Sequence, residues 1–175
     1  MKKFLALFAI GLATYVVAED LVLNPYGQQV VTIEKAGRTQ PVVTRRSEIL
    51  TAARTLSSAD NNSIFYLNAA AEFAVTLPAP ALDAEFTFIV KAAPSGASYT
   101  VVALGVGSAA NDIIIGSAVN AAGVAGDTGT ADDTISFVDG QAVAGDLVRV
   151  RSDGTKWYAT AQSNVAAGIT FTDVD

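Results

Sequence analysis

The 175-residue chain contains no cysteine and no histidine. Without cysteine it has no disulfide, no thiolate nucleophile and no thiolate ligand for a metal. Without histidine it lacks the side chain that most often transfers protons near neutral pH, so neither a Ser-His-Asp nor a Cys-His catalytic group can form. These absences predict a protein that is not an enzyme and has no cofactor. A hydrolase that uses carboxylates alone is the remaining enzymatic alternative.

Charged residues are also scarce. They make up 16% of the chain, against roughly a quarter in typical soluble domains, and hydrophobic residues make up 51%. Either a membrane-type segment or a large area buried against other subunits explains this composition. The charge is uneven, because the first 54 residues carry a net +3 and the remainder a net −9. An acidic body disfavours nucleic acid as the partner.

The N-terminus has the pattern of a secretory signal. Met1-Lys2-Lys3 precedes an apolar run over residues 4–17, and small residues lead up to Ala18. The run is short for a membrane span, which needs about 20 residues. Three interpretations of residues 1–18 stay open: a signal cleaved near Ala18, a retained membrane anchor through residues 4–17, or a segment buried in an assembly.

Residues 19–56 are interpreted as an extended arm. Asn24-Pro25-Tyr26-Gly27 is a turn signal, and residues 28–33 are the clearest strand candidate of the arm. Residues 47–56 are ambiguous between helix and extended chain. An arm that reaches a partner needs apolar contacts, and the arm's candidates for this role are Leu21, Val22, Leu23 and Tyr26.

From Ser57 onward, short runs rich in β-branched and aromatic residues alternate with clusters of Gly, Asn, Asp, Ser and Pro. This rhythm predicts an all-β body over residues 57–175, an antiparallel β-sandwich or jelly-roll-like domain of about nine short strands. The strands are expected near residues 63–68, 72–77, 85–91, 99–104, 112–119, 133–138, 146–152, 156–162 and 168–173. A long loop is expected between residues 120 and 132.

The clearest local prediction is a hairpin over residues 148–161. Asp153-Gly154 lies between two strands, and glycine supplies the positive φ that such a tight turn needs. Trp157 and Tyr158 follow the turn and must point to opposite faces of the sheet. One of them therefore faces outward, which makes Trp157 and Tyr158 further candidates for contact with a partner.

One loop gathers carboxylates. Asp127, Asp132 and Asp133 lie within seven residues, and oxygen-rich loops of this kind bind calcium. The spacing does not match the twelve-residue calcium loop, so a solvated polar turn without metal is expected. A cation site at these three residues is the alternative.

Residues 55–172 resemble a group of small β-rich proteins of tailed and related bacteriophages. The resemblance lies in the order of several short segments, none of them specific alone. The segments are Thr55-Leu56-Ser57-Ser58-Ala59-Asp60, Ile64-Phe65-Tyr66-Leu67-Asn68-Ala69-Ala70, Val75-Thr76-Leu77-Pro78-Ala79-Pro80, Phe86-Thr87-Phe88-Ile89-Val90, Gly145-Asp146-Leu147-Val148, Ser152-Asp153-Gly154-Thr155-Lys156-Trp157-Tyr158 and Gly168-Ile169-Thr170-Phe171-Thr172.

The resemblance implies a structural virion protein: a capsid decoration, cement or head-spike subunit on the capsid surface. Its expected partners are the major capsid protein or other virion subunits, reached through the N-terminal arm, and copies of itself, with a trimer favoured. The hydrophobic N-terminus departs from the pattern, since a decoration protein does not require it. The alternative is a secreted, periplasmic or surface-anchored β-sandwich that binds a glycan or a receptor.

Overall fold

The computed structural model describes residues 45–69, 71–105, 112–126 and 132–174, together with the backbone of three strands between residues 22 and 43. These residues divide into two units, one N-terminal and one that begins at Arg45. In the N-terminal unit, β1 (Val22–Leu23), β2 (Gln29–Lys35) and β3 (Arg38–Val43) form an antiparallel sheet in the order β1-β2-β3.

Several sequence-based predictions concern residues that the structure does not describe. Residues 1–18, Leu21 and Tyr26 lie outside the described residues, and so does Asp127. The strand expected at residues 28–33 is β2. No helix among the described residues has the length and apolar character to cross a membrane.

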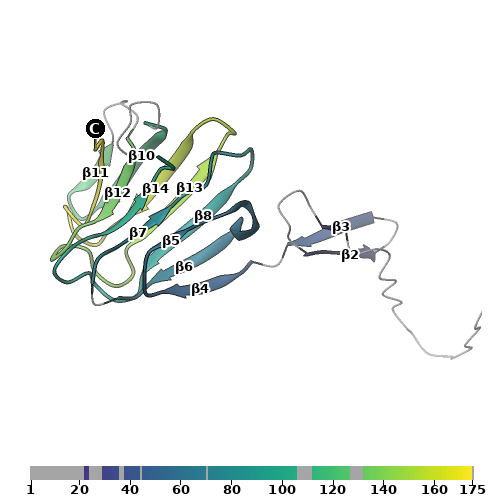
Figure 1. Ribbon diagram of the computed structural model, residues 1–175, viewed down its shortest axis with the longest axis horizontal. Coiled ribbons are helices and arrows are strands. Elements are labelled where there is room, and N and C mark those ends of the chain that lie inside the picture. Colours follow the sequence, from purple (N-terminus) through teal and green to yellow (C-terminus); the bar gives the residue numbers. More distant parts are fainter. Residues whose placement is uncertain are drawn as a thin grey trace, which may run out of the picture. The chain divides into compact units, whose positions relative to one another are not determined.

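The second unit, called the body here, consists of two sheets packed face to face (Figure 1). The seven-stranded sheet has the order β11-β10-β14-β13-β8-β6-β4, and the five-stranded sheet has the order β15-β12-β9-β7-β5. The strands of the larger sheet are β4 (Ser47–Leu50), β6 (Ser63–Leu67), β8 (Glu85–Val90), β10 (Ile114–Asn120), β11 (Gly123–Gly126), β13 (Leu147–Ser152) and β14 (Trp157–Gln162). Those of the smaller sheet are β5 (Arg54–Thr55), β7 (Phe73–Thr76), β9 (Tyr99–Val102), β12 (Thr134–Phe137) and β15 (Ile169–Thr172), and a 3-10 turn, η1 (Ser58–Asp60), follows β5.

The all-β sandwich is confirmed, and each of the nine expected strands is present. Three more strands complete the body: β11 within the expected long loop, and β4 and β5 within the expected arm. The body therefore begins at Arg45 and not at Ser57. Within residues 47–56, which the sequence left ambiguous, β4 and β5 form because they pair with β6 and β7, contacts that a local sequence pattern does not reveal.

Strand direction differs from the expected antiparallel arrangement. The chain passes from one sheet to the other between β4 and β9, so that β4, β6 and β8 run parallel in one sheet, and β5, β7 and β9 run parallel in the other. This is the coiling of a two-layer β-solenoid, followed by antiparallel strands, and it is not a jelly roll. The coils are unequal, since Ser47 pairs with Ile64 and Ile64 with Thr87, steps of 17 and 23 residues. Unequal steps explain why the sequence shows no repeat.

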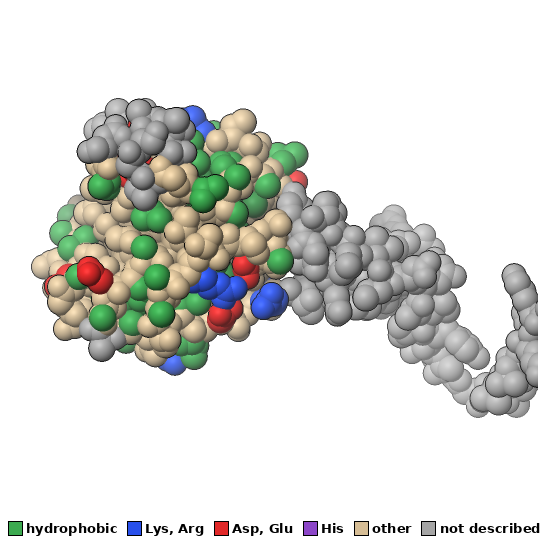
Figure 2. Space-filling model, in the orientation of Figure 1, with side chains coloured by type: hydrophobic (Ala, Val, Ile, Leu, Met, Phe, Trp, Pro, Cys, Tyr) green, Lys and Arg blue, Asp and Glu red, His purple; other side chains and the backbone are tan. Residues whose placement is uncertain are grey.

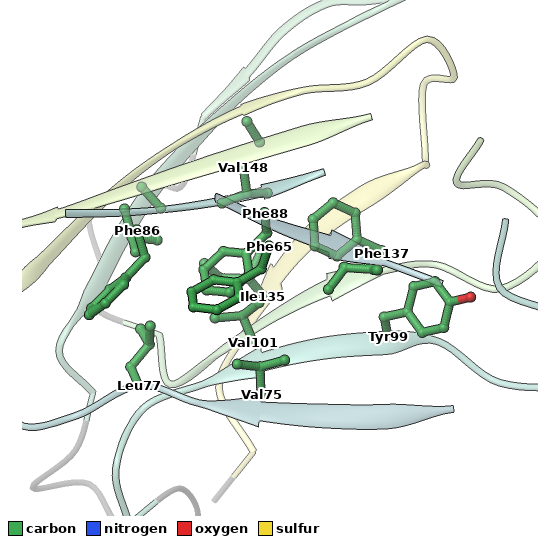
Figure 3. Packing of buried hydrophobic residues seen from close by; sticks show 14 of the residues in the cluster. Phe65, Val75, Leu77, Phe86, Phe88, Tyr99, Val101, Ile135, Phe137 and Val148 are labelled. Atoms are coloured by element: carbon green, nitrogen blue, oxygen red, sulfur yellow. The ribbon is translucent and has the colours of Figure 1, made fainter. Parts of the chain in front are cut away.

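The core lies between the sheets and is rich in aromatic rings (Figure 3). Alternation in β6 sends Phe65 inward, where its ring stacks on that of Phe88 with centroids 5.6 Å apart. Tyr99 lies at one end of the core, where its hydroxyl is 2.6 Å from the carbonyl oxygen of Ala69. The labelled residues of this core are Phe65, Val75, Leu77, Phe86, Phe88, Tyr99, Val101, Ile135, Phe137 and Val148.

A buried carboxylate connects the loops that flank β13 and β14. Asp146 is fully buried, and its Oδ2 accepts hydrogen bonds from the Val143 amide and the Ser163 hydroxyl, both at 3.0 Å. Its Oδ1 accepts from the amide of Asn164 at 2.8 Å. Gly168 lies against this group, because a Cβ there would come within 2.2 Å of the Ser163 oxygen. The carboxylate is thus satisfied by a tightly packed set of donors.

Candidate interaction surface

The outer face of the seven-stranded sheet carries a row of apolar side chains across four adjacent strands. Ile49 pairs with Tyr66, Tyr66 with Ile89, and Ile89 with Leu147, so these four residues lie side by side at one level of the sheet. We call them the apolar row. Ile49 is 51% exposed, and the other three are partly exposed.

The apolar row departs from the alternation expected for a sheet with one face in water. Such a sheet carries polar side chains outward, as Arg149 and Arg151 do on β13 while Val148 and Val150 are fully buried. Contiguous apolar side chains on an outer face are typical of protein–protein contact surfaces. Ile89 belongs to this departure, because it is a partly exposed apolar residue at an outward position of β8.

The row ends at an open sheet edge. Among the described strands, β4 pairs only with β6, and the carbonyls of Arg46 and Leu50 accept hydrogen bonds from the amides of Ile64 and Asn68 at 2.8 and 2.9 Å. Because backbone groups alternate in direction along a strand, those of Ser47 and Ile49 point to the open side. Unpaired edge groups of this kind can accept a further strand.

A groove of about 430 Å³ lies beside this edge. Its described lining is Ser47, Glu48, Ile49, Tyr66 and Lys91. The groove therefore joins the open edge to the first two residues of the apolar row.

The edge strand is held firmly from its inner side. Arg54 forms ion pairs with Asp60 at 2.6 Å and with Glu48 of β4, and its guanidinium lies over the Phe65 ring, 5.5 Å from the centroid. These contacts connect β4 to β5, η1 and β6. Two ion pairs and one cation–ring contact therefore fasten the edge strand to the rest of the body.

Positive charge gathers on the outer face at the opposite ends of these strands from the apolar row. The carboxylate of Glu85 contacts Arg151 at 2.6 Å, Arg45 at 3.4 Å and Arg149 at 3.5 Å. Three guanidinium groups around one carboxylate leave a local excess of positive charge. Arg46, which follows Arg45 in the sequence, is also exposed. A basic area on an otherwise acidic body favours a partner that presents carboxylates.

Trp157 and Tyr158, the two candidate aromatic residues, point to opposite sides of the sheet, as adjacent residues of one strand must. Tyr158 is 45% exposed, whereas Trp157 is completely buried and packs on Phe86, with ring centroids 5.6 Å apart. The prediction that Trp157 contacts a partner is therefore wrong, because the inner positions of β14 face the core. Tyr158 stays a candidate. Val22 and Leu23 form β1, whose backbone alone is described.

The hairpin turn positions Tyr158. The amides of Thr155 and Lys156 donate to Oδ1 of Asp153 at 2.8 and 2.9 Å, and the Tyr158 hydroxyl donates to Oδ2 at 3.0 Å. The amide of Lys156 is the largest of the causes that hold the pKa of Asp153 well below its usual range. The same Asp153–Tyr158 hydrogen bond raises the pKa of the Tyr158 phenol.

Of the two candidate acids of the predicted carboxylate loop that the structure describes, Asp133 belongs to an acidic cluster. Asp133 is fully buried and lies with Asp112 and Asp173, one carboxylate oxygen of each being within 4.8 Å of the others. Asp132 is not in this cluster; its backbone bridges to Ile114. The sequence did not point to Asp112 and Asp173, because they join Asp133 only through the pairing of distant strands. Carboxylates in this arrangement are a donor set that hard cations such as Ca²⁺ use.

Figure 2 shows one face of the molecule, on which hydrophobic side chains are scattered among backbone atoms and other uncharged side chains, and charged side chains are few. This agrees with the low charge content of the sequence. No protein-family model, no curated protein and no solved structure matches the chain.

Proposed function

We propose that this protein is a structural subunit of a bacteriophage virion, bound to the capsid surface as a decoration, cement or spike protein, with no catalytic role. The observation that carries the proposal is the apolar row of Ile49, Tyr66, Ile89 and Leu147, which ends at the open edge of β4. A surface of this kind serves to hold a neighbour.

The resemblance supports the virion assignment. Its segments fall in η1, in β6 to β8 and in β13 to β15, and so they occupy both sheets of the body. The likeness therefore extends over one folded body and is not confined to a single turn or hairpin. The absence of cysteine and histidine from the sequence supports a structural role.

The physical demands on such a subunit agree with the fold. A capsid-bound protein occupies many identical sites, so a weak contact made by each copy is multiplied by avidity when the copies are linked. A rigid two-layer body with an aromatic core presents the same surface at each site. The net charge of −6 favours solubility of the free subunit.

The test is association with particles, followed by electron microscopy and by gel analysis of purified virions. We expect the wild-type protein to copurify with a regular particle, and Ile49→Asp to lose this association because a carboxylate interrupts the apolar row. Val174→Asp is the matched control, since Val174 is 53% exposed and lies outside the row. Normal decoration by Ile49→Asp, or no particle association of the wild type, would contradict the proposal.

One observation favours the second candidate, a secreted or surface-anchored binding module. The signal-like start over residues 1–18 is the feature that a decoration protein does not require. Mass spectrometry of the native protein separates the candidates, because a mature chain that begins at Glu19 indicates export and an intact Met1 does not. Loss of glycan binding in Tyr158→Ala would favour this candidate, since Tyr158 is the exposed aromatic of the hairpin.

A further inference from the structure

We infer that the open edge of β4 binds residues 19–23 of a second copy of this chain, which add to the seven-stranded sheet as a parallel strand. The inference rests on the proposed function, in which the apolar row and the edge of β4 hold a neighbour, and it names one such neighbour. It concerns Glu19 to Leu23, a segment present whether or not the chain is cut near Ala18.

The edge itself favours a parallel addition. β8, β6 and β4 follow one another in parallel, and each new strand extends the apolar row by one residue, from Ile89 to Tyr66 to Ile49. The outward backbone groups of Ser47 and Ile49 supply hydrogen bonds to a further strand, and the groove beside β4 offers space for its side chains. The next residue in the row should again be apolar.

The charges and the residue spacing of two short segments indicate that residues 19–23 bind at the edge of β4. Glu19-Asp20 are the only acids before Glu34, and Arg45-Arg46 are the only adjacent arginines in the chain. When Leu23 is placed beside Ile49 in a parallel register, Glu19 and Asp20 come beside Arg45 and Arg46, because both pairs start four residues before the apolar residue.

The opposite direction loses this complementarity. An antiparallel strand with Leu23 beside Ile49 would place Asp20 and Glu19 beside Ala52 and Ala53, where no cation stands. Opposite charges beside each other on neighbouring strands stabilise a sheet, which favours the parallel register.

The strand must come from another copy. β3 is two strands from β1 in the N-terminal sheet, so a sheet that continued from β1 to β4 would place β3 and β4 about 14 Å apart, three strand spacings. Only three Cα–Cα distances separate Val43, at the end of β3, from Arg46. The carbonyl of Arg46 already accepts a hydrogen bond from β6, so Arg46 is fixed in position beside that strand. Three Cα–Cα distances reach about 11 Å at most. One chain therefore cannot make this pairing with itself.

The absence of cysteine makes the pairing directly testable. Full-length Leu23→Cys is mixed with Ile49→Cys that carries a mass tag, oxidised, and analysed on a non-reducing gel. Adjacent strands place the two Cα atoms about 5 Å apart, within the range that a disulfide spans. We expect a mixed, tagged dimer, and none when the tagged partner is Thr160→Cys, which is exposed on β14 far from the edge. Equal cross-linking with both partners, or with neither, would overturn the inference.

A charge exchange provides the second test. Arg45→Glu/Arg46→Glu should weaken self-association in sedimentation by at least tenfold, and adding Glu19→Arg/Asp20→Arg should restore it. Circular dichroism establishes that each variant folds. Unchanged association of Arg45→Glu/Arg46→Glu contradicts the pairing. A folded protein with all four substitutions that does not regain association also contradicts it.

The two proposals fail separately. A protein that joins particles but gives no specific cross-link keeps the proposed function and loses this inference. A protein that cross-links as expected but never joins a particle keeps the self-pairing and loses the proposed virion role.

Discussion

The Nε atom of Arg151 on β13 lies 2.6 Å from Oε2 of Glu85 on β8, and the two residues are paired directly across the strands. The same carboxylate contacts Arg45 and Arg149. Glu85 is thus the neutralising group for three cations, and its side chain is only 18% exposed while that of Arg151 is 63% exposed. The three arginines therefore share one partly buried carboxylate.

We therefore expect Glu85→Gln to lower the free energy of unfolding by about 1 kcal/mol, because the three arginines lose their shared carboxylate. The loss is no larger because solvent screens these exposed cations. Urea unfolding at low and high salt measures it, and the difference from wild type should shrink at 1 M salt. Glu72→Gln, at an exposed site, is the control. Equal stability of wild type and Glu85→Gln at low salt would refute the expectation.

The Asp153 turn should make stability depend on pH. Hydrogen bonds from Lys156 and Thr155 lower the pKa of Asp153 in the folded protein, so its contribution is fully present above the usual value of 3.8. That contribution is lost as the pH falls below 3.8 toward the lowered folded pKa. Asp153→Ala should therefore melt at a lower temperature than wild type near neutral pH, with the gap closing in acid. A gap that stays constant down to pH 2 would contradict this account.

Tyr158 offers an independent measure of the same contact. Its pKa is raised above 10.0 because its hydroxyl donates to Asp153 and because the carboxylate charge disfavours the phenolate. We expect Asp153→Ala to return the pKa of Tyr158 toward 10.0 in an NMR titration of the tyrosine ring carbons. A pKa of Tyr158 that is the same in Asp153→Ala as in the wild type would contradict this contact.

Gly168 should be intolerant of a side chain. A Cβ there meets the hydroxyl oxygen of Ser163 at 2.2 Å and Oδ2 of Asp146 at 3.1 Å. Gly168→Ala should cost about 1–3 kcal/mol, because displacing Ser163 removes a donor from a buried carboxylate. In a Ser163→Ala background the same change should cost less, since the obstructing oxygen is gone. Additive losses in this double-mutant cycle, measured by urea unfolding, would count against the packing argument.

Asp133 and Asp173 face each other where β12 and β15 meet. Thr134 pairs with Thr172, so Asp133 and Asp173 are opposite each other at the next position of this antiparallel pair. Asp112 is close to both. Like charges placed opposite each other destabilise a sheet, so Asp173→Asn should raise the free energy of unfolding by about 0.5 kcal/mol in EDTA. Thermal unfolding with and without Ca²⁺ measures this, and Glu72→Gln serves again as control. A loss of stability in EDTA would contradict the repulsion.

Much of the fold was determined by the sequence alone. Runs of β-branched and aromatic residues between turn-forming clusters located the nine expected strands, and Asp153-Gly154 located the hairpin, because both signals depend only on neighbours along the chain. The alternation of side chains along a strand required that Trp157 and Tyr158 face opposite ways. It could not say which residue faced inward, since that depends on which side of β14 the second sheet covers.

Only the tertiary structure decided the rest. Residues 47–50 and 54–55 became strands through pairing with β6 and β7, and the parallel direction of β4, β6 and β8 follows from a chain that crosses between the sheets in unequal steps. The apolar row and the acidic cluster arise in the same way, from residues far apart in the sequence that the register brings to one level. Local preference sets where a strand begins and ends, but its neighbours and their direction depend on how the whole core closes.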